Sequence, residues 1–168
     1  MNVYVFYCAN SLDLEEMNRL RDRLRGDTFR EIRLPCSGKV NVPYLVKAFE
    51  AGADGVAIVA CKQGECRHVE GNMRAQKRAQ AVDSLLEEVG LGTGRIAVIQ
   101  MKDSGVEQVI ADIEEFCTKV RNMPVPYPAL RTAGGSLKGE AFGDGKGRNH
   151  HPQAALEDAT HDPQETSL

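Results

Sequence analysis

The chain has 168 residues, of which 42% are hydrophobic and 27% are charged, and this balance is ordinary for a soluble globular protein. The formal net charge of −3 gives no electrostatic reason to expect a nucleic-acid partner. No stretch approaches the roughly 18 apolar residues of a membrane span, and the first residues, MNVYVFYCANSLDLEE, indicate a buried strand rather than a signal peptide. We therefore expect a cytoplasmic protein with no transmembrane segment.

Two periodicities alternate along the first 121 residues. Short apolar runs rich in β-branched and aromatic residues predict strands at 3–7, 30–34, 55–60 and 95–101. The third and fourth runs are apolar enough to predict burial on both faces of a sheet. Apolar residues at three- and four-residue steps predict a helix over Leu14–Leu24, and a shorter helix over Pro43–Ala51 ends at Gly52. Two longer helices are predicted from the apolar positions Val69, Met73, Val82, Leu86 and Val89, and then from Val106, Val109, Ile110, Ile113 and Val120.

Strands that alternate with helices predict parallel pairing through right-handed crossovers. The expected fold is a small, doubly wound α/β domain over residues 1–121, with a mostly parallel four-stranded sheet, in the order 2-1-3-4, flanked by helices. Residues 122–168 are rich in Pro, Gly and polar residues and have no apolar period, so they predict a disordered or extended C-terminal tail. Within that tail, His150 and His151 are interpreted as solvated loop residues.

The five cysteines are the chemically informative residues, because disulfides seldom persist in the cytoplasm. Cys8, Cys36 and Cys61 each end a predicted strand, and Cys66 lies in the loop after Cys61. In a parallel sheet the carboxyl ends of all strands lie at one edge, where ligands bind. We therefore expect these four thiols to converge. Cys117 lies on the apolar face of the last helix and is interpreted as a buried hydrophobic residue.

The neighbours of the four thiols suit an anionic centre. Gly38 and Gly64 let the backbone approach closely and direct N–H groups at an anion. Lys39, Lys62 and Arg67 flank the same loops. Such donors and cations stabilise a centre of four thiolates and raise its reduction potential.

Other candidate chemistry is weak. The chain has no dinucleotide fingerprint after a strand and no P-loop, and the glycines of G-L-G-T-G at 90–94 fall at the opposite edge of the predicted sheet. His68 is interpreted as a solvated first-turn residue. The basic residues Arg74, Lys77 and Arg78 are interpreted as a solvated helix face.

Three hypotheses remain open for the thiols. A [2Fe–2S] cluster takes four thiolates, the number that the predicted edge supplies. A structural zinc ion also takes four, although zinc sites usually combine two close cysteine pairs. Redox-active dithiol chemistry between Cys61 and Cys66 is the third hypothesis, although such pairs are usually C-x-x-C at a helix start.

Three segments in order resemble one protein family: L-P-C-S-G-K-V at 34–40, K-A-F-E-A-G-A-D-G-V at 47–56, and C-K-Q-G-E-C-R-H-V-E-G-N at 61–72. They are similar to the delta subunit of methyl-viologen-reducing hydrogenase, an iron–sulfur electron-transfer family, over roughly residues 2–120. The resemblance implies a non-catalytic [2Fe–2S] subunit of an anaerobic oxidoreductase complex. Its expected partners are a hydrogenase or other dehydrogenase module and a heterodisulfide-reductase-like flavin and iron–sulfur subunit. The cluster ligands implied are Cys8, Cys36, Cys61 and Cys66.

The resemblance has one departure. The family often shows C-x-x-C after the first strand, whereas this chain reads C-A-N-S, with Ser11 at the second cysteine position. Four thiols remain, so the departure bears on the identity of the ligands more than on the function.

Overall fold

The computed structural model describes residues 1–124, so the predicted tail, including His150 and His151, lies outside the described residues apart from its first three positions. The described elements are β1 (Asn2–Cys8), α1 (Leu14–Arg23), β2 (Thr28–Leu34), the 3₁₀ turn η1 (Ser37–Lys39), α2 (Val42–Glu50), β3 (Gly55–Ala60), α3 (Gly71–Glu88), β4 (Ile96–Gln100) and α4 (Val106–Arg121). Among these helices, none combines the length and the apolar character needed to cross a membrane.

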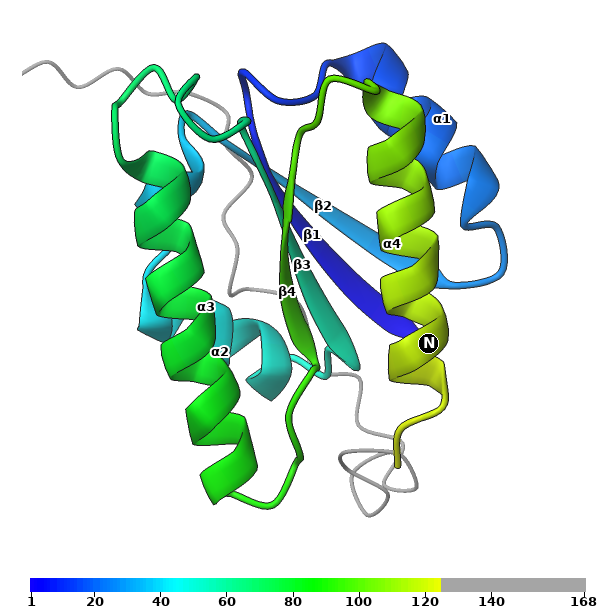
Figure 1. Cartoon of the computed structure of the whole chain (residues 1–168). Helices are drawn as coiled ribbons and strands as arrows, with labels where there is room; N and C mark the ends of the chain where they lie inside the picture. Colours follow the sequence, from blue (N-terminus) through cyan, green and yellow to red (C-terminus); the bar gives the residue numbers. More distant parts are fainter. Residues whose placement is uncertain (125–168) are drawn as a thin grey trace, which may run out of the picture.

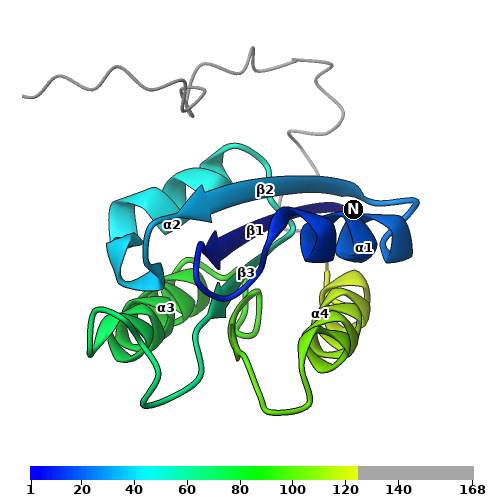
Figure 2. The ribbon, with the colours of Figure 1, turned by 90° about the horizontal axis from the view of Figure 1, so that it is seen from above.

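The four strands form one parallel sheet in the order β2-β1-β3-β4, which confirms the predicted topology. Helices α1 and α4 cover one face, and α2 and α3 cover the other (Figures 1 and 2). Each face has its own apolar core, one with α1 and α4 and the other with α2 and α3. Two helices therefore cover each face of the sheet, which is the doubly wound arrangement that the alternation of strands and helices predicts.

Burial separates the central strands from the edges. Every residue of β3 is buried, and β1 is buried from Val3 onwards. The expectation that the fourth strand is buried on both faces is wrong for part of its length, since Ala97, Val98 and Gln100 are only half-buried. Strand β4 pairs with β3 on one side only and ends the sheet, so its outer side is not covered by another described strand.

Helix α3 packs through smaller residues than its apolar pattern predicts. Its buried side chains include Ala75, Ala79, Val82 and Leu86, and the two alanines have almost no exposed surface. Val69, Met73 and Val89 were also expected on the buried stripe, but they are 80%, 45% and 69% exposed. Val69 precedes the helix and Val89 caps it, so neither follows the helical period.

The helix starts differ in how their first N–H groups are satisfied. Asp13 and Glu16 form a capping box at the start of α1, and the Asn41 side chain accepts from the Tyr44 N–H at the start of α2. Helix α3 starts at Gly71 with no side-chain cap. Its first N–H groups need other acceptors, because a helix start leaves them without intrahelical partners.

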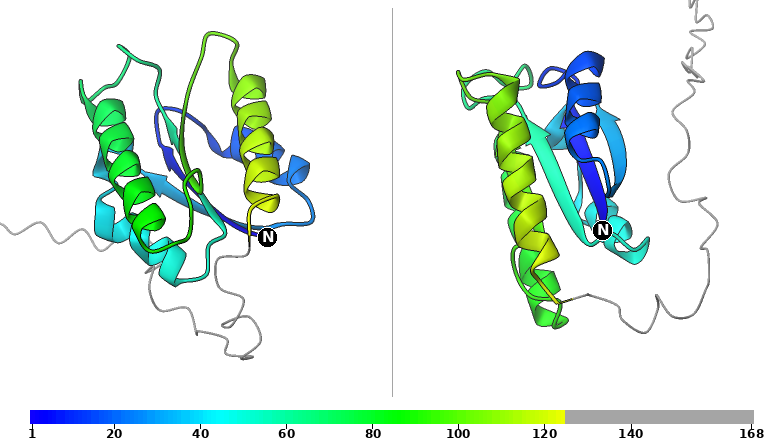
Figure 3. Two further views of the ribbon diagram at one scale, coloured as in Figure 1. Left: turned by 60° about the horizontal axis from the view of Figure 1, so that its bottom comes forward. Right: turned by 90° about the vertical axis from the view of Figure 1, so that its right-hand side faces the viewer.

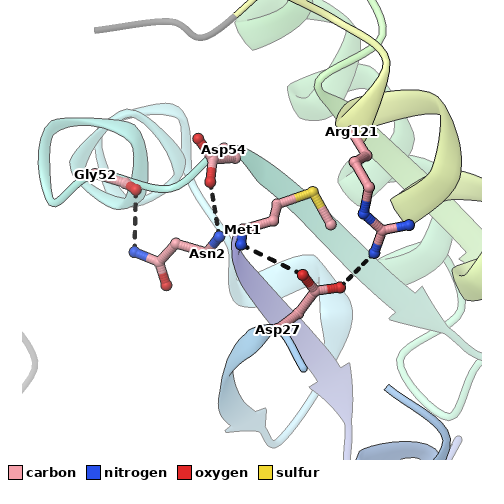
Figure 4. A network of polar contacts seen from close by, with 6 residues as sticks. All are labelled: Met1, Asn2, Asp27, Gly52, Asp54 and Arg121. Carbon is pink, nitrogen blue, oxygen red and sulfur yellow. Dashed lines mark hydrogen bonds and ion pairs between the residues drawn. The ribbon is translucent and has the colours of Figure 1, made fainter. Parts of the chain in front are cut away.

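The amino-terminal edge of the sheet is held by a polar network (Figure 4). Asp27, before β2, pairs with the Met1 ammonium group at 3.3 Å and with the Arg121 guanidinium at 2.6 Å. Asp54, before β3, accepts from the Asn2 N–H at 2.7 Å. The chain start and the end of α4 are thereby held side by side (Figure 3).

Arg95 is a buried residue that binds backbone carbonyl oxygens at the same edge of the sheet. Its side chain is almost fully buried and donates to the carbonyl oxygens of Leu91, Asp54 and Pro124. A buried guanidinium needs such acceptors, because an unpaired buried charge is strongly destabilising. Arg95 therefore links the end of α3, the start of β3 and the segment after α4.

Replacing Arg95 by methionine should lower the free energy of unfolding by about 2–4 kcal/mol, because three carbonyl oxygens lose a buried donor. Denaturant unfolding monitored by circular dichroism measures the change. The control is Arg25→Met, whose guanidinium is exposed beside Asp22, and its unfolding midpoint should stay nearly unchanged. Equal midpoints for the two variants would contradict the structural role of Arg95.

Candidate functional site

Two of the four strand-edge thiols meet directly. Cys8 is the last residue of β1, and Cys61 follows the last residue of β3. Because β1 and β3 are adjacent and parallel, with Tyr7 opposite Val59, their ends lie side by side. The Cys8 and Cys61 Sγ atoms are 3.4 Å apart, and both side chains are buried.

The other two thiols meet across Gly71. Cys36 precedes η1 and Cys66 lies in the loop before α3. A Cβ atom on Gly71 would stand 2.3 Å from the Cys36 Sγ atom and 3.0 Å from the Cys66 Sγ atom. A Cβ atom on Gly38 would stand 2.7 Å from the Gly71 Cα atom. Neither position has room for a side chain, so two glycines allow the η1 turn and the start of α3 to bring these thiols together.

Backbone N–H groups converge on the second pair. Gly38 N–H donates to the Cys36 Sγ atom at 3.4 Å, within the 3₁₀ turn. The N–H groups of His68, Gly71 and Asn72 point to the Cys66 thiol. Cys66 thus takes the place of the missing side-chain cap of α3, at the helix end where partial positive charge favours an anion.

Cys61 and Cys66, one thiol from each pair, therefore differ in pKa. Burial and the neighbouring Cys8 thiol raise the pKa of Cys61 to about 12. Burial also acts on Cys66, but the three backbone N–H donors outweigh it and hold the pKa of that thiol below its ordinary value. The Cys36 thiol keeps a raised pKa, because burial outweighs the single Gly38 donor.

Two polar residues of α3, Asn72 and Arg78, hold the surrounding loops. The buried Asn72 side chain donates to the carbonyl oxygens of Cys61, at 3.4 Å, and Lys62, at 3.2 Å. Arg78 donates to the carbonyl oxygens of Gly38, at 2.7 Å, and Val40, at 2.5 Å. Arg78 was expected on a solvated helix face, but it is half-buried and ties η1 to α3.

Ser11 is buried but faces the backbone. Its hydroxyl donates to the Cys8 carbonyl oxygen at 2.7 Å and also lies 3.5 Å from the Val59 carbonyl oxygen. It therefore closes the turn after β1, and the hydrogen bonds described for its hydroxyl run to main-chain oxygens rather than to thiols.

The structure thus brings Cys8, Cys36, Cys61 and Cys66 to one edge of the sheet as two pairs. The pairing is Cys8 with Cys61 and Cys36 with Cys66, which differs from the Cys61–Cys66 pair that dithiol chemistry requires. All five cysteines are free, and Cys117, a residue of α4, is buried in the core. Over residues 1–124, no three Cys, His, Asp or Glu side chains are grouped so as to surround one metal ion.

The predicted cations divide into paired and unpaired groups. Lys62 pairs with Glu65 at 3.2 Å and also with Asp103. Lys39 and Arg67 take part in no ion pair among the described residues. His68 is exposed, as expected, although its backbone N–H faces Cys66.

Comparisons with known proteins show which family this chain belongs to. The family described as methyl-viologen-reducing hydrogenase, delta subunit, matches residues 3–124. The vhu iron-sulfur subunit of the F420-non-reducing hydrogenase of Methanocaldococcus jannaschii is 36% identical over 103 residues, which are 61% of this chain and 77% of that protein. The corresponding protein of Methanococcus maripaludis is 32% identical over 60% of this chain and 75% of that protein.

A longer relative contains a similar segment. One component of the ferredoxin/F(420)H(2)-dependent CoB-CoM heterodisulfide reductase of Methanosarcina acetivorans is 31% identical over 118 residues. The match covers 70% of this chain but only 14% of that protein. A domain similar to this one therefore also occurs as part of a much larger chain.

With all metal removed by a chelator, Cys66 should react with iodoacetamide at least about tenfold faster than Cys61 at pH 8, because the thiolate is the nucleophile. The Cys61 rate should rise about tenfold for each pH unit and level off only near its pKa of about 12. Mass spectrometry of the digested protein at several pH values measures both rates. Equal rates at pH 8 would contradict the difference in pKa between these two thiols.

Proposed function

We propose that this protein, which belongs to the methyl-viologen-reducing hydrogenase delta subunit family, is a [2Fe–2S] electron-relay subunit whose cluster is held by Cys8, Cys36, Cys61 and Cys66. The observation that carries the proposal is the meeting of four thiols from three strand ends as two close pairs. Such a centre stores one electron at a time.

The donor set fits a dinuclear centre. A [2Fe–2S] cluster takes two thiolates on each iron, and the structure supplies the pairs Cys8–Cys61 and Cys36–Cys66. Gly71 keeps the space beside the second pair free of side chains. The buried edge also limits solvent access to the thiols, which is one of the conditions that set a reduction potential.

The surrounding dipoles suit a negatively charged centre. Four thiolates give a cluster net negative charge, and N–H groups from Gly38, His68, Gly71 and Asn72 face two of them. Hydrogen bonds to ligand sulfur atoms raise the reduction potential. These donors come from the backbone of two packed segments, so the protein needs no titrating side chain to provide them.

The names of the relatives suggest the partners. Those of about this domain's length are named as iron–sulfur subunits of hydrogenases, and the longer one as part of a heterodisulfide reductase. We infer that this chain passes electrons between a hydrogenase or other dehydrogenase module and a heterodisulfide-reductase-like flavin and iron–sulfur subunit. The relay requires no general acid or base, and it is assigned to the cytoplasm of an anaerobic cell.

The full chain purified without oxygen should be brown and contain about two irons and two labile sulfides. Replacing Cys36 by serine should remove most of the iron and the electron paramagnetic resonance signal of the reduced protein, because one thiolate is lost. Cys117→Ala is the matched control and should keep both, since Cys117 lies in the core away from the strand edge.

Two results would contradict the proposal. A colourless protein with one bound zinc ion favours a zinc-stabilised binding subunit, whose ligand variants lose stability rather than colour. A Cys36→Ser variant that still reduces a small disulfide through Cys61 and Cys66 favours a dithiol oxidoreductase.

Replacing Ser11 by alanine should leave the iron content unchanged, because the Ser11 hydroxyl bonds main-chain oxygens. It should lower the free energy of unfolding by about 1 kcal/mol through the lost buried hydrogen bond. Iron analysis and denaturant unfolding of the same preparation measure the two effects. An iron-free Ser11→Ala protein would instead assign the hydroxyl to the cluster.

A further inference from the structure

Ser37 carries a buried hydroxyl that has no hydrogen-bond partner among residues 1–124. The residue is 1% exposed, so its hydroxyl is shielded from the solvent at the surface. Most buried side-chain polar atoms in proteins have a partner, because a buried hydroxyl without one costs free energy. Alanine would fill nearly the same space without that cost, so the hydroxyl needs an explanation.

Ser11 shows the ordinary arrangement of a buried serine in the same part of the protein. Its hydroxyl donates to the Cys8 carbonyl oxygen at 2.7 Å, which closes a turn. The backbone of Ser37 is also used in a turn, since its carbonyl oxygen accepts from the Val40 N–H at 3.2 Å. The η1 turn therefore needs the backbone of Ser37, but it does not need the side-chain oxygen.

The η1 turn brings Ser37 to the candidate site. Cys36 directly precedes Ser37, and the Cys36 Sγ atom accepts from the Gly38 N–H within the turn. The turn also contacts β1, which ends at Cys8, and β3, which is followed by Cys61. The hydroxyl is thus buried in a turn that packs on the strand ends where the other thiols begin.

The cysteine thiols do not satisfy this hydroxyl. The described hydrogen bonds to the thiols come from other groups, such as the Gly38 N–H at Cys36, and none in the described part of the chain includes the Ser37 Oγ atom. The proposed [2Fe–2S] cluster brings further acceptors to this place, namely its two inorganic sulfides. An O–H group is a suitable donor to such an anionic sulfur atom, because a hydrogen bond to a charged acceptor is stronger than one to a neutral acceptor.

We propose that the Ser37 hydroxyl donates a hydrogen bond to a bridging sulfide of the cluster and thereby raises the reduction potential. The proposal rests on the proposed relay function and adds a side chain that tunes the cluster without being one of its ligands. A hydrogen-bond donor favours the reduced cluster, which carries one more negative charge than the oxidised cluster. Removal of the donor therefore makes the cluster harder to reduce.

The reduction potential of the full-length holoprotein tests this role. In an anaerobic titration followed by electron paramagnetic resonance, Ser37→Ala should lower the equilibrium constant for one-electron reduction about tenfold, which moves the potential down by about 59 mV. Ser11→Ala is the matched control, because it also removes a buried serine hydroxyl but one that bonds main-chain oxygens. Its constant should stay within about twofold of wild type.

A second measurement detects the proton itself. The reduced cluster is paramagnetic, so electron–nuclear double resonance of protein exchanged into D₂O resolves deuterons that lie close to it. Wild type and Ser11→Ala should show the same set of couplings, and Ser37→Ala should lack one of them. An identical set in Ser37→Ala would overturn the proposal, because the hydroxyl proton then does not face the cluster.

Denaturant unfolding of the full-length protein after removal of metal by a chelator gives a third measurement. Ser37→Ala should keep or raise the unfolding midpoint, because its hydroxyl has no partner in the described chain. Ser11→Ala should lower the midpoint through its lost hydrogen bond. A lower midpoint for Ser37→Ala would show that the hydroxyl is bound within the protein, which contradicts the proposal.

The outcomes separate the two proposals. A wild-type chain without iron and sulfide counts against the relay function before any variant is measured. A brown wild type and a brown Ser37→Ala protein with equal potentials count against the role of Ser37 alone. A Ser37→Ala protein that binds no iron would show that the serine is needed to build the site rather than to tune it, which also overturns the inference.

Discussion

The close contact between Gly38 and Gly71 is the constraint on which the candidate site depends. It joins a 3₁₀ turn after β2 to the first residue of α3 with no side chain between them. The contact places Cys36 and Cys66 together, and Arg78 holds it by donating to two carbonyl oxygens of the turn. A larger residue at either position would displace backbone or sulfur atoms, which pack too closely to yield.

The same contact makes the two thiol pairs unequal. Cys8 lies at the end of β1 and Cys61 directly after β3, both are buried, and the side-chain amide of Asn10 donates to the Cys8 Sγ atom at 4.0 Å. Cys36 and Cys66 lie beside a 3₁₀ turn and an uncapped helix start, where backbone N–H groups have no other acceptor. Negative charge is therefore stabilised on Cys66, which is also the most exposed of the four thiols.

The amino-terminal and carboxyl-terminal ends of the strands differ in what their loops contain. At the amino-terminal edge, Asp27 and Arg95 hold the chain start, β3 and the end of α4 through buried or half-buried polar groups. At the carboxyl-terminal edge, the loops carry the thiols and Val69, a valine whose backbone is strained at a positive φ of 61°. Rigidity at one edge permits an exposed, strained loop at the other, as is common where a scaffold presents a functional site.

The sequence by itself determined the strands, their parallel order and the gathering of four cysteines at one edge, because alternating periodicities leave few topologies for a chain of this length. It also identified the family through three short segments. It placed Val69, Met73 and Val89 on a buried stripe, and for Val69 and Val89 the reason is that apolar spacing does not reveal where a helix begins and ends. It placed Arg78 on a solvated face, because the carbonyl oxygens that Arg78 contacts belong to a turn distant in sequence. Only the tertiary structure decided which thiols pair, why Gly71 must lack a side chain and which N–H groups face Cys66. Those features arise where segments distant in sequence touch, and no local pattern records that contact.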